Sequence, residues 1–351
     1  MENKELYPLL FRPNLHSVVW GGKRLKPWKG LPTDDTPVGE SWEVSVVPSA
    51  TSIVANGIWE GKPLDHIIAT APASFLGESV SHQYGGHFPL LVKFIDANTD
   101  LSIQVHPNDE MAQREHGKMG KSEMWYIIDA KPESYLYAGF KEHITPYEYK
   151  QRVENGSITD VLARHKVKTG DVFYLPAGRV HAICGGILLA EVQQSSDVTY
   201  RIFDYNRLGM DGQPRELHTE LAAQALDYSV ESEYRTIYTP RENGASLVMD
   251  TPYFTVRINE VDKPLHRDLI KYDSFIISMC VHGSCRIRIR ENGNEVLLSE
   301  GQTCLIPAAI ADYDIIPNEN SGICRILDAF IDNKDRSLLR SVTRFLHMTR
   351  K

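Results

Sequence analysis

The chain has 351 residues, of which 42% are hydrophobic and 24% are charged, and its formal net charge is −8. This balance is typical of a folded globular protein, and the length allows two ordinary domains or one large β-domain. The net acidity offers no basic face for the phosphates of nucleic acid, and no apolar run approaches the ~20 residues that span a bilayer. We therefore expect neither a nucleic-acid partner nor a membrane association.

The cysteine content predicts reduced thiols rather than a disulfide framework. The number is odd, no Cys-x-x-Cys pair occurs, and most cysteines lie in apolar, strand-like runs, where a free cysteine behaves as a small hydrophobic residue. The five are Cys184, Cys280, Cys285, Cys304 and Cys324. Because the N-terminus also leads into no long apolar segment, a cytoplasmic location is expected.

Short β-branched or aromatic runs, separated by Gly, Pro, Asn and Asp, predict a mostly β fold of the sandwich or barrel type. Along the first two thirds of the chain, the predicted strands cover residues 42–47, 90–96, 101–105, 123–129, 172–175, 187–193 and 199–203. Helices are expected as insertions at residues 64–70, 217–226 and 337–346. A further helix is predicted to begin after Thr145, because this capping hydroxyl precedes Pro146 and is followed three residues on by Glu148.

A polar, irregular stretch at residues 229–250 precedes a second series of strands, so we expect two domains, 1–235 and 236–351. In the second series, residues 286–290 alternate strictly between Arg and Ile, and residues 291–294 predict a tight hairpin turn.

A weak internal repeat connects the two halves. Residues 170–181 align without gaps on residues 301–312, with the glycine and the proline at the same offsets. The position of His181 is taken by Asp312 in the second copy. The alignment favours duplicated β-barrels, of which the second has lost a ligand.

Four residues form a candidate metal site. On a strand, Gln104 and His106 project to the same face, while Glu123 opens an apolar run and His181 follows a Pro-Ala-Gly turn. Two imidazoles, a carboxylate and an amide oxygen suit zinc and leave positions open for substrate. Each residue has another interpretation: a single histidine is compatible with a hydrogen-bonded core residue, and Glu123 with a surface position beside a turn.

Several ordered motifs resemble one enzyme family. Residues 170–181 resemble the second cupin motif, and Gln-x-His followed by Lys-x-Glu resembles the first motif of type I mannose-6-phosphate isomerases. Residues 194–205 are similar to the signature of that family, and residues 39–43 to its N-terminal block. The resemblance covers nearly all of residues 7–230 and only the outline of the remainder. It implies the short bacterial form, with two cupin-type (jelly-roll) β-barrels and a few added helices.

The resemblance also implies roles for single residues. The implied ligands of one zinc ion per chain are Gln104, His106, Glu123 and His181. Arg201 falls at the active-site arginine of the family, and Lys93, Ser102 and Lys121 fall at positions that line its sugar-phosphate pocket. Cationic side chains suit a phosphorylated substrate in an acidic protein. From its local sequence alone, Lys93 is equally compatible with an edge-strand lysine.

The implied reaction interconverts mannose 6-phosphate and fructose 6-phosphate by proton transfer between C1 and C2 through an enediol. Zinc would act as the Lewis acid, and the always protonated Arg201 would give electrostatic help rather than act as a base. The proton carrier stays open among Asp197, Lys121 and a zinc-bound water, and Asp197 is also compatible with a purely turn-forming role.

Two other functions compete with this one. Two histidines and a carboxylate also form the iron site of non-haem cupin oxygenases, although Gln104 and the cations argue against it. The other is a non-catalytic sugar-phosphate sensor. Such a sensor need not keep the metal ligands, whereas this chain keeps the whole predicted set and Arg201, which argues against a sensor. The second domain is expected to be a degenerate, structural cupin-like domain ending in a helix, and the protein is expected to be a monomer or a weak homodimer.

Overall fold

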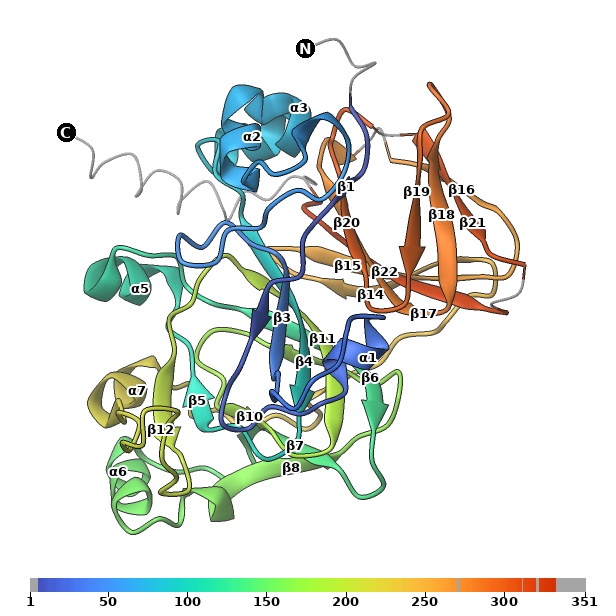
Figure 1. The fold of residues 1–351 in the computed structure, drawn as a ribbon. Helices are drawn as coiled ribbons and strands as arrows, with labels where there is room; N and C mark the ends of the chain where they lie inside the picture. The colour runs from blue at the N-terminus through green and yellow to red at the C-terminus, as the bar shows by residue number, and fades with distance from the viewer. Residues whose placement is uncertain (1–5, 270–271, 311, 320–321, 333–351) are drawn as a thin grey trace, which may run out of the picture. The chain divides into compact units, whose positions relative to one another are not determined.

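The computed structural model describes residues 6–269, 272–310, 312–319 and 322–332, and its fold is mostly β with short helices (Figure 1). The helix expected at residues 337–346 lies outside the described residues. The chain forms two compact units: the central unit comprises residues 14–42 and 90–237, and the terminal unit residues 1–13, 43–89 and 238–351. The division into a catalytic domain 1–235 and a C-terminal domain 236–351 stays a prediction.

The central unit contains two sheets. The seven-stranded sheet has the order β13 (Arg235–Thr236), β9 (Val172–Leu175), β6 (Glu123–Ala130), β11 (Ile187–Gln194), β4 (Leu90–Ala97), β3 (Glu40–Val44) and β2 (Leu15–His16). The five-stranded sheet has the order β12 (Tyr200–Phe203), β5 (Ile103–Val105), β10 (His181–Ile183), β7 (Tyr135–Phe140) and β8 (Leu162–Lys166). The seven strands predicted for this part of the sequence are thus present, with ends displaced by a few residues.

One apolar core lies between these two sheets. Trp125 and Leu189 of the larger sheet pack in the same cluster as Ala138 and Ile183 of the smaller one. Side chains alternate across a strand, so the neighbouring residues of the smaller sheet face outward.

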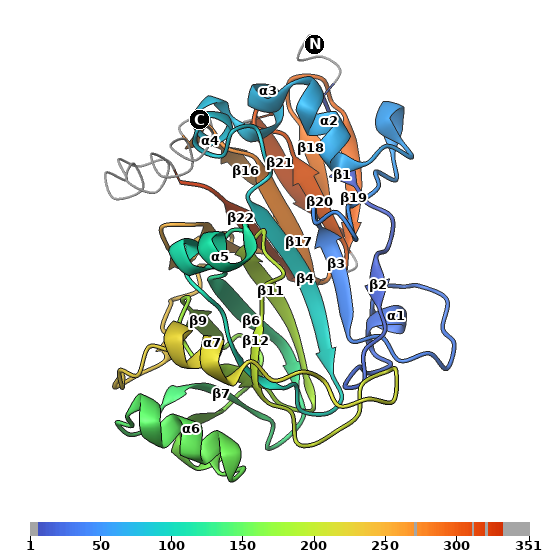
Figure 2. The same cartoon turned by 90° about the vertical axis from the view of Figure 1, so that its left-hand side faces the viewer.

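Helices cover that outer face. A second cluster joins Val105 and Ala182 of the sheet to Tyr149 of α6 (Pro146–Glu154) and Ala222 of α7 (Thr219–Ala225). The two helices lie side by side (Figure 2). The predicted start of α6 is confirmed, because Thr145 forms a complete capping box with the third helical residue. The remaining α-helices are α1 (Leu25–Trp28) and α5 (Asp109–His116) in this unit, and α2 (Leu64–Thr70), α3 (Pro72–Leu76) and α4 (Glu78–Gln83) in the terminal unit. None of the described helices is long and apolar enough to cross a membrane.

The terminal unit also contains two sheets. The six-stranded sheet has the order β1 (Leu9–Leu10), β20 (Thr303–Ile306), β17 (Ile276–His282), β22 (Cys324–Phe330), β15 (Thr255–Val261) and β14 (Gly244–Asp250). The four-stranded sheet has the order β16 (Leu265–Asp268), β21 (Asp312–Pro317), β18 (Ser284–Ile289) and β19 (Glu295–Ser299). The predicted hairpin is confirmed, because β18 and β19 pair antiparallel on either side of residues 290–294.

The internal repeat has a structural counterpart. Residues 170–181 form β9, a turn and the first residue of β10, and residues 301–312 form β20, a turn and the first residue of β21. In each unit the segment passes from the larger sheet to the smaller one. The mostly β fold is confirmed, and all four sheets are open in the described residues. The arrangement as two cupin-type (jelly-roll) β-barrels stays a prediction.

A candidate metal centre in the central unit

Strand pairing brings two of the predicted ligands together. Ile103 and Val105 pack in the outer core, so Gln104 between them faces the other sheet. His181 begins β10 and stands directly opposite Gln104 in the ladder. His106 follows β5 directly, and its side chain is 1% exposed.

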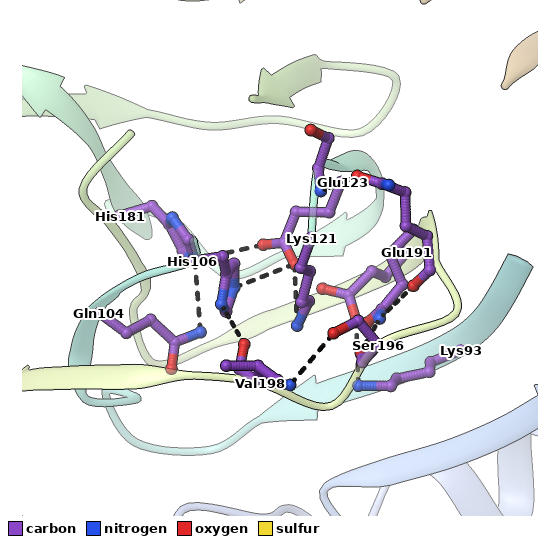
Figure 3. Close-up of polar contacts among 12 residues, drawn as sticks. Lys93, Gln104, His106, Lys121, Glu123, His181, Glu191, Ser196 and Val198 are labelled. Atoms are coloured by element: carbon purple, nitrogen blue, oxygen red, sulfur yellow. Dashed lines mark hydrogen bonds and ion pairs between the residues drawn. The ribbon is translucent and has the colours of Figure 1, made fainter. Parts of the chain in front are cut away.

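Glu123 reaches the same point from the larger sheet. It opens β6 at a position that alternates inward with Trp125, a member of the core between the sheets. Its carboxylate lies 3.3 Å from Nε2 of His106 and 3.2 Å from Nε2 of His181 (Figure 3). The ligand atoms of these three buried residues lie within 4.8 Å of one another, and the group could hold a metal ion.

Backbone contacts determine which ring nitrogen of each histidine carries the proton. His106 Nδ1 lies 3.0 Å from the carbonyl oxygen of Val198, and His181 Nδ1 lies 2.8 Å from that of Arg179. Because a carbonyl oxygen only accepts, each Nδ1 must donate, which leaves each neutral Nε2 with a lone pair directed at Glu123. His106 Nε2 and both Glu123 oxygens are buried without a hydrogen-bond partner among the described residues, and the one ion pair of Glu123 with a lysine is that of Oε2 with Lys121 at 3.0 Å. Converging lone pairs of this kind call for a cation.

The electrostatics keep these three groups in the ligating form. Burial, reinforced by the positive charge of Lys121, lowers the pKa of His106 to about 3, and burial also lowers the pKa of His181. Burial alone would raise the pKa of Glu123, but Lys121 Nζ at 3.0 Å and the two histidines outweigh it and hold this pKa well below its usual range. Neutral imidazoles and an ionised carboxylate are the forms that bind zinc.

Gln104 completes the predicted set of four. Its Nε2 lies 3.3 Å from Nε2 of His181. Since the oxygen and nitrogen of an amide exchange places by a half-turn of the group, Gln104 can direct its oxygen to the same point. All four residues that the sequence predicted as ligands therefore meet at one location.

Lys93 lies in a buried charge network that the sequence did not predict. Its Nζ is 3.3 Å from Glu191 and 3.5 Å from Glu40, and it lies 4.8 Å from the ring centroid of Trp42. Burial would lower the pKa of Lys93, but the two carboxylates raise it above its usual value. The available signal was Glu191 itself, a charged residue in the otherwise apolar first part of β11.

The other predicted site residues, Arg201, Ser102 and Asp197, differ in how deeply they are buried. Arg201 pairs in register with Gln104, donates through Nη1 to the carbonyl oxygen of Glu216, and keeps its buried Nε without a partner among the described residues. Ser102 is buried, 4% exposed, two residues before Gln104. Asp197 is exposed and forms an ion pair at 2.6 Å with Lys118, also on the surface.

Known proteins are similar to this chain in both sequence and fold. The family model for the type I phosphomannose isomerase catalytic domain matches residues 9–143. The chain is 36% identical to the probable mannose-6-phosphate isomerase GmuF of Bacillus subtilis, over 92% of this chain and 98% of that protein. It is 37% identical to the mannose-6-phosphate isomerase ManA of the same organism, over 71% of this chain and 78% of that protein.

Solved structures agree with these relatives. A crystal structure of mannose 6-phosphate isomerase from B. subtilis superposes with a TM-score of 0.80 and 31% identity, over 92% of this chain and 99% of that one. A putative mannosephosphate isomerase from Archaeoglobus fulgidus, at 22% identity and a TM-score of 0.75, shares the fold. The chain therefore belongs to the type I phosphomannose isomerase family.

Proposed function

We propose that this protein interconverts mannose 6-phosphate and fructose 6-phosphate at a zinc site formed by Gln104, His106, Glu123 and His181. The observation that carries the proposal is the convergence of two neutral imidazole nitrogens on an ionised carboxylate, with no proton available to lie between them. Family membership supports the assignment of the reaction.

The donor set favours zinc among the common metals. Two imidazoles, one carboxylate and one amide oxygen are borderline to hard ligands, and they leave room for substrate oxygen. When bound, zinc supplies a Lewis acid that polarises a substrate oxygen. The hydrogen bonds from the two Nδ1 atoms to backbone carbonyls orient the imidazoles before any ligand arrives.

We assign the anionic parts of the substrate to Arg201 and Lys121. The free Nε of Arg201 can donate to a phosphate or enediolate oxygen, and Lys121 adds positive charge beside Glu123. Lys93 is already compensated by two carboxylates, so we assign it, with Ser102, to hydrogen bonds with sugar hydroxyls.

Proton transfer between C1 and C2 through an enediol needs a group that both takes and returns a proton. Lys121 is buried at the centre, whereas Asp197 is held at the surface by Lys118. We therefore rank Lys121 before Asp197 as the proton carrier. Measuring kcat and zinc content for Lys121→Met and Asp197→Asn distinguishes the two candidates. The variant that lacks the proton carrier should have a much lower kcat and nearly unchanged zinc content.

The test is formation of fructose 6-phosphate from mannose 6-phosphate by the purified protein before chelation, after chelation and after zinc return. Activity should disappear with the metal and return with zinc, and His106→Ala and Arg201→Ala should both be impaired. Absence of turnover by zinc-replete protein contradicts the proposal. Activity restored only by ferrous iron, with oxygen consumed, would identify an oxygenase instead. A cytoplasmic location and a monomeric or weakly dimeric state stay predictions from the sequence.

A further inference from the structure

One histidine holds the backbone of Arg201 at two points. In the described part of the chain β12 is an edge strand, so no further strand pairs with Arg201 on its outer side. His218 takes that place. Its N–H donates to the carbonyl oxygen of Arg201 at 2.7 Å, and its Nδ1 accepts from the N–H of Arg201 at 3.1 Å. Both outward backbone groups of Arg201 are therefore satisfied by a single residue.

The chain returns to this edge because Asp204 ties together the loop between β12 and α7. The buried carboxylate of Asp204 accepts from Nε of Arg207 at 2.8 Å and from Nε of Arg215 at 2.7 Å. These two arginines lie near opposite ends of the loop. The second of them comes three residues before His218, so the same carboxylate that closes the loop leads the chain back beside Arg201.

The side chain of Arg201 is held by the same segment. Its neighbours on either side in β12 pack in the outer core, so Arg201 projects to the other side of the sheet, as Gln104 opposite it does. Nη1 of Arg201 donates to the carbonyl oxygen of Glu216 at 2.8 Å, whereas the buried Nε has no partner among the described residues. Residues 216–218 thus fix the backbone and one end of the guanidinium, and they leave one donor free for a ligand.

The imidazole of His218 serves Arg201 and not the helix that follows it. His218 is the N-cap of α7, a position at which Ser, Thr, Asp and Asn typically accept a hydrogen bond from the helix, but its side chain makes no such bond. Because an N–H only donates, Nδ1 must present a lone pair to Arg201, and the proton of the neutral ring lies on Nε2. A second proton, on Nδ1, would replace the acceptor by a donor and break this contact.

The surroundings of His218 favour the neutral ring. Burial lowers the pKa of His218, Glu216 opposes this effect with Oε2 3.9 Å from Nε2, and the positive charges of Arg201 and His116 reinforce it. The ring of Tyr200 lies 6.0 Å from that of His218, and its hydroxyl is hydrogen-bonded to His116 at 2.9 Å. The acceptor is therefore retained at neutral pH and lost on acidification.

We propose that His218 is a positioning residue for Arg201, and that it holds the guanidinium in place for the anionic part of the substrate only while its Nδ1 is unprotonated. The inference rests on the proposed function, in which Arg201 binds a phosphate or enediolate oxygen. The contacts of His218 are with the backbone of Arg201, so it acts on the substrate through that residue.

The first test is steady-state kinetics with metal analysis of zinc-replete variants. His218→Leu should lower kcat/KM about 10- to 100-fold at unchanged zinc content, because a shift of a binding group by about 1 Å costs up to about 100-fold. His218→Asn should recover most of this loss, because its Oδ1 is as many bonds from the backbone as Nδ1 and can accept the same hydrogen bond. His116→Leu is the matched control: this histidine contacts Tyr200 rather than Arg201, and its loss should change kcat/KM by less than ~2-fold.

A double-mutant comparison separates positioning from an independent effect of His218. In the Arg201→Ala background, His218→Leu should cause no further loss of kcat/KM, because a residue that acts through the guanidinium then has nothing to position. Fully additive losses, a His218→Leu variant as active as the unmutated protein, or no recovery in His218→Asn would each overturn the inference.

A third measurement uses the unmutated protein and needs no turnover. In nuclear magnetic resonance spectra of isotope-labelled protein, the backbone N–H signal of Arg201 should shift as the pH falls and His218 takes up its second proton. In His218→Asn this shift should be absent. An Arg201 signal that does not follow the ionisation of His218 would overturn the inference. Absence of turnover by the unmutated, zinc-replete protein contradicts the proposed function instead, and the Arg201 signal still decides whether His218 positions Arg201.

Discussion

Residues 170–181 of the central unit and residues 301–312 of the terminal unit follow the same path from one sheet to the other and end on different chemistry. The first path ends on His181, which is buried beside Glu123. The second ends on Asp312, which is half-exposed and lies 3.5 Å from His266. The repeated backbone thus supplies equivalent positions in the two units, and in the central unit the residue at that position belongs to a group that could hold a metal ion.

The buried carboxylates of the two units differ in the same way. Glu123 keeps its charge because a lysine and two histidines outweigh the effect of burial. In the terminal unit, burial raises the pKa of Asp328, which accepts hydrogen bonds from Ser278 and Asn259 and has Arg267 only at 3.6 Å. The interior of the central unit thus favours an ionised carboxylate at Glu123. The interior of the terminal unit instead raises the pKa of Asp328, which is held by hydrogen bonds as a structural group.

The largest expected effect is the difference in kcat/KM between substitutions of His181 and of Asp312, the residues at the ends of the two repeated segments. His181→Ala should lower isomerase kcat/KM by at least ~100-fold and reduce bound zinc, because it removes a ligand at the centre. Asp312→Ala, at the matched position, should change kcat/KM by less than ~2-fold, as for other substitutions away from a site. Steady-state kinetics and metal analysis of both variants check this, and a comparable loss in Asp312→Ala would remove the distinction between the two copies.

Breaking the buried network of Lys93 should be the next largest effect. Lys93→Met leaves Glu40 and Glu191 without their cation and should lower the free energy of unfolding by about 3–5 kcal/mol. Lys118→Met removes an exposed ion pair with Asp197 and should cost less than ~1 kcal/mol. Urea unfolding of the two variants gives the comparison, and equal costs would show that burial of the network adds nothing.

The metal-free protein should lose stability as the pH falls below about 6.5. In the unfolded chain His106 takes up a proton near that pH, whereas in the folded protein its pKa is lowered to about 3, so the unfolded state binds more protons between these values. This single group accounts for a loss of about 2 kcal/mol between pH 6.5 and 5, and His181 and Glu123 act in the same direction.

Chelated protein unfolded in urea at several pH values measures that slope. His106→Gln should flatten it, while substitution of the exposed His282 by Gln should leave it unchanged. A slope that is identical in all three proteins would contradict the buried, neutral state of His106.

The smallest expected effect concerns the turn of the repeat. Gly178 has a φ of +91° and donates from its N–H to the carbonyl oxygen of His106, whereas its counterpart Ala309 does not have a positive φ. Gly178→Ala should therefore cost about 1–2 kcal/mol, and Ala309→Gly less than ~1 kcal/mol. Thermal unfolding compares them, and a neutral Gly178→Ala would show that the two turns do not differ in strain.

Local patterns in the sequence predicted much of this molecule. Periodicity and capping predicted the strands of the central unit and α6, and strand alternation with the family motifs predicted the four residues that meet at the candidate metal centre. The pairing of Lys93 with Glu40 and Glu191 was not predictable, because it depends on the register between β3, β4 and β11. The membership of residues 43–89 in the terminal unit depends on contacts across some 200 residues of sequence, which no local pattern encodes.

The most direct test of the metal centre is X-ray diffraction at the zinc absorption edge, from crystals of the zinc-replete protein. We expect an anomalous peak roughly 2.0–2.2 Å from Nε2 of His106, Nε2 of His181 and an oxygen of Glu123. An enzymatically active, zinc-replete protein with no peak between these three residues would contradict it.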